Sequence, residues 1–69
     1  MTREEVFKAA VKVLVDAGVH PSGPRIRREL GRAEMSGMLN GEETRWRREL
    51  LTSLGWTRGE GLSARWRRP

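Results

Sequence analysis

The chain of 69 residues contains no cysteine and no tyrosine, and it has one histidine and one phenylalanine. The absence of cysteine excludes a disulfide framework and any site in which thiolates bind a metal. The one histidine, His20, cannot build a structural zinc site without cysteine partners. The sequence therefore predicts one small domain that is held together by a modest apolar core.

Long hydrophobic runs are also missing. No stretch of about eighteen or more apolar residues occurs, so no membrane-spanning helix is predicted. The first residues mix both signs of charge and lack the pattern of a signal peptide. We therefore expect a cytoplasmic protein, and the basic composition adds the expectation that it associates with the nucleoid.

Groups suited to catalysis are sparse as well. The carboxylates lie mostly on predicted helix faces beside basic residues, where pairing at a spacing of four explains them. No glycine-rich phosphate loop follows a predicted strand, and no metal-ligand spacing occurs. Because so short a chain rarely forms a deep pocket, we expect no enzyme, cofactor, metal or small-molecule substrate.

Positive charge, by contrast, is abundant, and most of it is arginine. The chain has 14 Lys and Arg against 9 Asp and Glu, which gives a net charge of +5. Residues 1–20 are balanced, so the whole excess lies in residues 21–69. The planar guanidinium group fits phosphate oxygens and guanine edges, so the composition favours nucleic acid as a partner. A solvated surface encoded by a GC-rich genome is the alternative that composition leaves open.

A first helix is predicted from Thr2 to Ala17. Thr2 and Glu5 have the spacing of a capping box, and Gly18 is suited to end the helix. Its apolar stripe consists of Val6, Phe7, Ala10, Val11, Leu14 and Ala17. We expect this helix to serve as scaffold.

A second, shorter helix is predicted between Ser22, as its N-cap, and Gly31, with Pro24 in its first turn. Ile26 and Leu30 give it a narrow buried edge. The segment from Arg32 to Asn40 is interpreted as a long turn or as one distorted helical turn over the core. It is longer than the usual turn of about three or four residues in a helix-turn-helix.

Asn40 is predicted to cap a third helix that extends to Leu54, with Glu43 completing a capping box and Gly55 ending the helix. Its buried side consists of Trp46, Leu50, Leu51 and Leu54. At steps of about 100° per residue, the opposite side carries Arg45, Arg48, Glu49 and Thr52.

The remaining residues predict a β-hairpin, with strands at 56–58 and 62–68 and a turn at 59–61. Leu62, Ala64 and Trp66 alternate with polar residues, as in a half-buried strand. A lone hairpin is marginal in water, so this one must pack on the helices, with Trp56 and Trp66 as anchors. The predicted fold class is mainly α with a C-terminal β-hairpin, in one domain over residues 1–69.

With this order of elements, the chain resembles the winged helix-turn-helix superfamily, in the small form frequent in phage and plasmid proteins. The resemblance covers nearly the whole chain, and it rests on residues 21–31 (PSGPRIRRELG) and 50–56 (LLTSLGW). It implies three helices and a two-stranded wing that bind duplex DNA. The helix at about 40–54 would enter the major groove, and the wing at about 56–68 would follow the flanking backbone. The resemblance also implies a recognition role for Arg45 and Arg48, and wing contacts from Arg58, Arg65 and Arg67.

The outer side of the third helix supplies the candidates for base and phosphate contacts. These are Thr44, Arg45, Arg48, Glu49 and Thr52. Arg45 or Arg48 could bind guanine O6 and N7, whereas Glu49 is better explained by pairing with Arg45 four residues earlier. Arg47 lies nearer the apolar side and is expected to lay its stem over the core.

Two further groups of arginines are expected to contact phosphate. The hairpin supplies Arg58, Arg65, Arg67 and Arg68, and the second helix supplies Arg25, Arg27 and Arg28. Contacts of this kind add affinity rather than sequence choice. Simple solvation explains the second group almost as well, and His20 is interpreted as an incidental surface residue.

The sequence therefore predicts sequence-specific binding of double-stranded DNA, by a regulator of transcription, replication or recombination or by the DNA-binding domain of one. Since one small domain binds weakly, a homodimer, tandem binding or fusion to a larger protein is expected. Two alternatives stay open. One is a protein–protein adaptor whose basic surface meets an acidic partner. The other is an RNA or single-strand binder, which needs an exposed Trp46 or Trp66 for base stacking.

Overall fold

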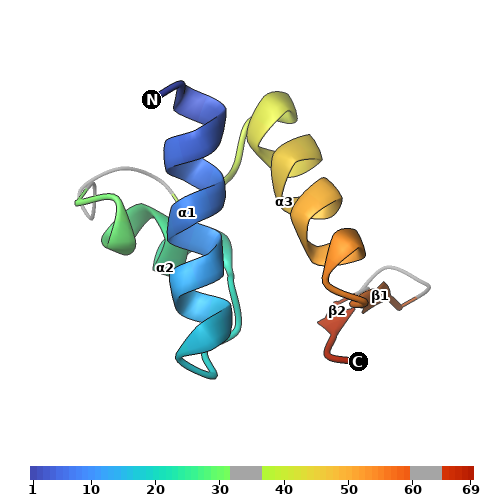
Figure 1. Cartoon of the computed structure of the whole chain (residues 1–69). Coiled ribbons are helices and arrows are strands. Elements are labelled where there is room, and N and C mark those ends of the chain that lie inside the picture. The colour runs from blue at the N-terminus through green and yellow to red at the C-terminus, as the bar shows by residue number, and fades with distance from the viewer. Residues whose placement is uncertain (32–36, 60–64) are drawn as a thin grey trace.

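The computed structural model describes residues 1–31, 37–59 and 65–69, and in these it has three helices and a two-stranded antiparallel sheet. In chain order the elements are α1 (Arg3–Asp16), α2 (Gly23–Glu29), α3 (Gly41–Ser53), β1 (Thr57–Arg58) and β2 (Trp66–Arg67). Helix α1 packs against both α2 and α3, and the hairpin lies at the C-terminal end of α3 (Figure 1). The predicted mainly helical class is confirmed. None of the helices described is both long and apolar enough to cross a membrane.

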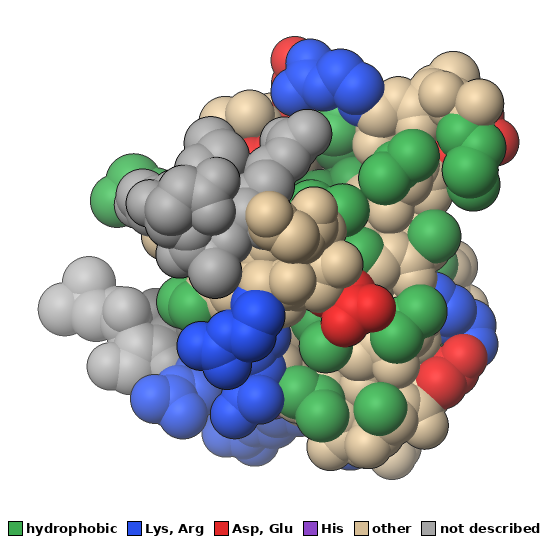
Figure 2. All heavy atoms as spheres, turned by 90° about the vertical axis from the view of Figure 1, so that its left-hand side faces the viewer, with side chains coloured by type: hydrophobic (Ala, Val, Ile, Leu, Met, Phe, Trp, Pro, Cys, Tyr) green, Lys and Arg blue, Asp and Glu red, His purple; other side chains and the backbone are tan. Residues whose placement is uncertain are grey.

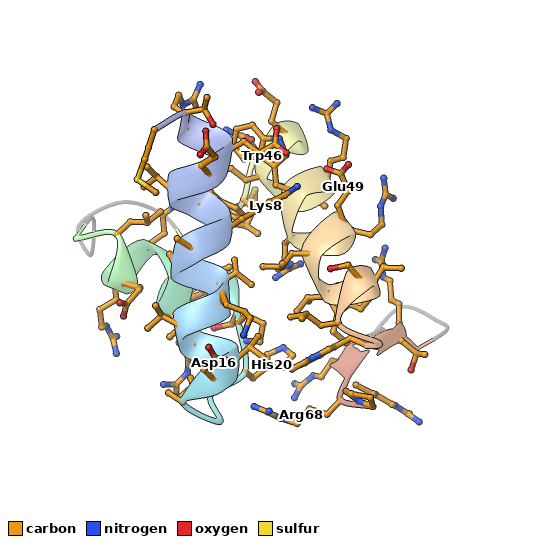
Figure 3. The ribbon with its side chains drawn as sticks, in the orientation of Figure 1. Lys8, Asp16, His20, Trp46, Glu49 and Arg68 are labelled. Carbon is orange, nitrogen blue, oxygen red and sulfur yellow. The ribbon has the colours of Figure 1, made fainter. Side chains whose placement is uncertain are left out.

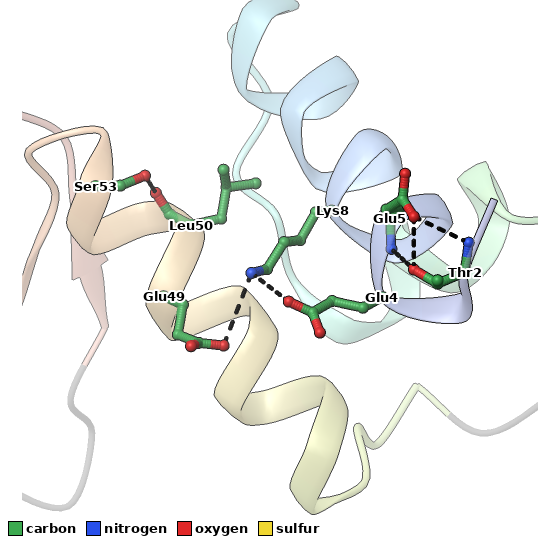
Figure 4. Close-up of polar contacts among 7 residues, drawn as sticks. All are labelled: Thr2, Glu4, Glu5, Lys8, Glu49, Leu50 and Ser53. Atoms are coloured by element: carbon green, nitrogen blue, oxygen red, sulfur yellow. Dashed lines mark hydrogen bonds and ion pairs between the residues drawn. The ribbon is translucent and has the colours of Figure 1, made fainter.

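Both predicted capping boxes are present. At the start of α1 the Thr2 hydroxyl accepts the Glu5 N–H at 3.1 Å, and the Glu5 carboxylate accepts the Thr2 N–H at 3.2 Å (Figure 4). Asn40 and Glu43 make the same reciprocal bonds at the start of α3, at 2.8 and 3.1 Å. These bonds satisfy backbone donors that a first helical turn leaves free. Ser22 occupies the N-cap position of α2 but makes no cap bond through its side chain.

The core draws side chains from all three helices and from the residue that directly precedes β1. It consists of Phe7, Val11, Leu14, Ile26, Trp46, Leu51 and Trp56. The rings of Phe7 and Trp46 meet in a tilted arrangement with centroids 5.7 Å apart. Trp66 is half-buried against this cluster, so both predicted hairpin anchors reach the core.

The predicted stripe of α1 is too wide. Val6 is 42% exposed, and Ala17 is exposed as well. Val6, Val13 and Ala17 are spaced by seven and four residues, so they share one exposed flank of α1. Figure 2 shows hydrophobic side chains exposed over the face of the molecule that it presents.

A buried ion pair joins α2 to α3. The two terminal nitrogens of Arg27 donate to the two carboxylate oxygens of Glu43 at 2.7 and 2.6 Å, and Arg27 Nη2 also donates to the Met38 carbonyl at 3.2 Å. The side chains are only 8% and 6% exposed. Arg27 was expected to contact phosphate, and this prediction is wrong, because its guanidinium group is enclosed between two helices.

Burial acts to raise the pKa of Glu43. The hydrogen bonds from Arg27 and from the backbone N–H of Asn40 outweigh it and, with the Arg27 charge, hold the pKa below its ordinary value of 4.5. The carboxylate is therefore charged at neutral pH, and the pair is a true ion pair.

The hairpin pairs in a different register from the one that a turn at 59–61 requires. Thr57 pairs with Arg67 and Arg58 pairs with Trp66, and the Gly59 N–H donates to the Arg65 carbonyl at 3.0 Å. A turn confined to 59–61 would instead oppose Arg58 to residue 62, so the predicted turn is wrong. Residues 60–64 of the predicted hairpin lie outside the described part of the chain, and so do residues 32–36 of the predicted connection.

Met38, in the described end of that connection, is 81% exposed. Its neighbour Leu39 is half-buried against the core instead.

Replacing Glu43 by Gln should destabilise the fold. The substitution keeps the shape and the capping position but leaves the Arg27 charge buried without its partner, which costs roughly 3–5 kcal/mol. Urea unfolding followed by tryptophan fluorescence measures this loss, and the exposed neighbour Glu42→Gln serves as the control. The double variant Arg27→Met/Glu43→Leu should be less destabilised than Glu43→Gln. Equal stability of Glu43→Gln and Glu42→Gln would contradict the role of the pair.

The stability of the fold should also depend on acid pH through Glu43. Its folded pKa is depressed, so its contribution is fully present above the unfolded value near 4.5 and is lost as the pH falls through the folded pKa. Unfolding free energies measured across this range should fall more steeply for the natural chain than for Glu43→Gln. Parallel curves for the two proteins would show that Glu43 is not the group responsible.

Candidate nucleic-acid interface

The outer side of α3 presents an uninterrupted polar row. Thr44, Arg45, Arg48 and Thr52 are all exposed. Arg45, Arg48 and Thr52 are spaced by three and four residues, which places them on one side of the helix. The buried Trp46 and Leu51 hold the opposite side against the core. As predicted, two guanidinium groups and two hydroxyls therefore face away from the molecule on a single rigid element.

Glu49 is exposed, but it is oriented toward α1. Its carboxylate lies 3.7 Å from the Lys8 ammonium, which also hydrogen-bonds Glu4 at 2.8 Å (Figure 4). The Glu4 hydrogen bond is the main cause that raises the pKa of Lys8 above 10.5, with Glu49 adding to it. The ion pair expected between Glu49 and Arg45 is thus replaced by one with Lys8, at the boundary between α1 and α3.

Of the three arginines predicted as phosphate contacts on α2, two are at the surface. Arg25 and Arg28 are exposed, whereas Arg27 forms the buried pair with Glu43. No local pattern distinguishes Arg27 from Arg25, because both are direct neighbours of the fully buried Ile26. The contact with Glu43 on α3 separates them.

The arginines of the hairpin are exposed but do not all share one face. Because Arg58 pairs with Trp66 while Thr57 pairs with Arg67, Arg58 and Arg67 project from opposite faces of the ribbon. Arg68 places its guanidinium group 5.0 Å from the centre of the Trp56 ring, a cation–π contact. The hairpin therefore offers positive charge in more than one direction.

Arg47 links α3 to the loop between α1 and α2. Its side chain is half-buried, and Nη1 donates to the Pro21 carbonyl at 3.2 Å. Burial, with a smaller contribution from the charge of Arg58, lowers the pKa of Arg47. The half-buried side chain thus reaches from α3 to the loop, and its Nε is buried.

Around this loop lies a group that sequence reasoning did not find, here called the His20 cluster. It consists of His20 with Arg25, Arg47, Arg65 and Arg68. The His20 ring lies beside that of Trp56, with centroids 6.2 Å apart. Loss of water around the ring, followed by the charges of the four arginines, lowers the pKa of His20 below 6.5. The members come from four separate segments, so no local motif could have revealed them.

The figures show where these groups lie. His20 and Arg68 lie at one end of the molecule, whereas Lys8 and Trp46 lie toward the other (Figure 3). On the face shown in Figure 2, the largest group of Lys and Arg side chains lies at one lower corner, and smaller ones lie at the top and at the right edge beside acidic side chains.

The described part of the chain offers little support for a small-molecule or metal site. A pocket of about 180 Å³ lies between the starts of α1 and α3 and includes Phe7, Glu43 and Trp46 in its lining. The carboxylate in this lining, that of Glu43, is already hydrogen-bonded to Arg27. Among the described residues, no three His, Asp or Glu side chains come together to hold a metal ion.

No protein-family model, curated protein or solved structure matches the chain. The function must therefore be inferred from the positions and charges of its own side chains.

Proposed function

We propose that the chain is a non-enzymatic, sequence-specific binder of double-stranded DNA, built as a small winged-helix-like domain. The observation that carries the proposal is the outer row of α3, where Arg45 and Arg48 stand exposed between Thr44 and Thr52. Helix α3 has 13 residues, so it is about 20 Å long and slender enough for the major groove. On its buried side, Trp46, Leu51 and the Arg27–Glu43 ion pair hold the helix against the rest of the domain.

Each group of arginines has a distinct role in this proposal. Arg45 and Arg48 contact base edges, with guanine O6 and N7 as their natural acceptors. Arg58, Arg65 and Arg67 of the hairpin, and Arg25 and Arg28 of α2, contact phosphates and orient the domain. Glu49 has no part, because Lys8 holds it at the boundary with α1. A regulator of transcription, replication or recombination, working as a dimer or within a larger protein, is the setting we propose.

The burial of the tryptophans disfavours the single-strand alternative. Trp46 is 5% exposed and Trp66 is half-buried, so neither offers a free ring for base stacking. The adaptor alternative has one observation in its favour, namely the exposed Val6 and Val13 on the outer side of α1. The two functions use different faces, so substitutions on α1 and on α3 separate them.

Replacing Arg45 or Arg48 by Ala should relax base preference. A good arginine–guanine pair provides roughly 1–3 kcal/mol of discrimination, so the ratio of dissociation constants for selected and scrambled duplexes should shrink about five- to a hundredfold. Fluorescence anisotropy measures both constants, with a duplex selected from a random library. Lys12→Ala, which removes one exposed charge from α1, is the matched control. An unchanged ratio in both α3 variants would exclude the recognition role.

Replacing Arg67 by Ala should instead weaken binding to all duplexes similarly. A phosphate contact releases about one condensed counterion, so the slope of log K against log salt should fall by about one. The measurement is a salt series with the selected and the scrambled duplex. A loss restricted to the selected duplex would assign Arg67 to base recognition instead.

A further inference from the structure

The His20 cluster is built from independent contacts. The Arg68 guanidinium group and the His20 ring both lie against Trp56, at 5.0 and 6.2 Å between centres. Beside His20, the Pro21 carbonyl accepts a hydrogen bond from Arg47. Trp56 itself is buried, and its backbone N–H donates to the Leu51 carbonyl at 2.9 Å. The ring against which Arg68 and His20 lie is therefore held rigidly.

The charged groups that act most strongly on His20 all have the same sign. The charges of Arg25 on α2, Arg47 on α3, and Arg65 and Arg68 of the hairpin all act on His20. Contacts with Trp56 and with the Pro21 carbonyl place Arg68 and Arg47 next to it. Helix α1 ends near the loop in Asp16, but that carboxylate is hydrogen-bonded to Lys12 at 2.7 Å. Like charges held together repel one another, and the repulsion is relieved when an anion binds among them. Such a group of positive charges favours a bound anion.

We propose that the His20 cluster binds phosphate groups of the duplex DNA backbone and that His20 takes up a proton as they bind. This inference rests on the DNA-binding function proposed above and adds a defined site to it. The site lies at the loop after α1, away from the outer row of α3, so it would contact the DNA backbone rather than base edges.

Proton uptake follows from the charges. In the free protein the four arginines disfavour the imidazolium form of His20. A bound phosphate offsets their charge, and the imidazolium can donate from both ring nitrogens, so the pKa of His20 rises on binding. A group whose pKa rises in the complex strengthens binding as the pH falls. One proton changes the affinity by no more than about tenfold per pH unit.

His20 is the only histidine in the chain, so the ring-proton signal of this one side chain can be followed without ambiguity by NMR. The pKa of His20 is measured between about pH 5 and 8 in the free protein, with a duplex of roughly two helical turns, and with a single strand of the same length. We expect the pKa to rise with the duplex. Inorganic phosphate is a further probe and should have the same effect only at much higher concentration.

Affinity measurements test the same site in variants. His20→Gln should bind duplex as the natural chain does near pH 8 and should lack the tightening at lower pH. Arg25→Gln/Arg65→Gln should weaken duplex binding and remove the rise in the pKa of His20. The matched control is Arg3→Gln/Lys8→Gln, which removes the same charge from the part of α1 away from His20 and should keep that rise.

The possible outcomes separate phosphate binding at the His20 cluster from the proposed DNA-binding function on which it rests. Duplex binding with an unchanged pKa of His20, or with the pH dependence retained in His20→Gln, would contradict the inference and leave the DNA-binding proposal standing. Absence of duplex binding at low salt would contradict both. A larger effect from the single strand, or an equal effect from inorganic phosphate at the same concentration, would also rule out a duplex-backbone site.

Discussion

The carboxylate of Glu43 sets the direction in which α3 presents its outer side. It receives both terminal nitrogens of Arg27, and it also accepts the Asn40 N–H within the capping box. Arg27 in turn holds the Met38 carbonyl, so the chain entering α3 is tied to α2. Helix α2 has seven residues and no side-chain cap at Ser22, and so short a helix depends on tertiary contacts. One ion pair thus fixes both the start of α3 and its position relative to α2.

Arginine has three different roles around this pair. Arg27 is enclosed and neutralised by Glu43, and Arg47 is half-buried and holds the loop at Pro21. Arg45 and Arg48 are exposed to solvent on the side of α3 opposite the core. The positive charge is therefore divided between an internal clamp, a support for the loop and a free surface. This division makes it possible for a chain of net charge +5 to pack tightly and still expose a face suited to a polyanion.

Sequence patterns predicted the elements and the local caps well, because both depend on neighbouring residues. Thr2 with Glu5, Asn40 with Glu43, and the outward side of α3 followed from spacing alone. The hairpin register and the environment of Arg27 did not, since each depends on residues far apart in the chain. The partner of Glu49 was missed for the same reason: Lys8 belongs to another helix. His20 was interpreted as incidental, although it lies where four segments meet, and only tertiary structure brings those segments together.

The central claim is that the outer row of α3 enters the major groove of a DNA duplex, while arginines of the hairpin contact its backbone. An amide NMR titration of the whole chain with random duplex DNA at low and moderate salt tests it most directly. The account predicts shifts concentrated at residues 44–48 and 57–67 at low salt, which diminish as the salt concentration rises. The absence of shifts at low salt, or shifts concentrated around Val6 and Val13 on α1, would contradict it.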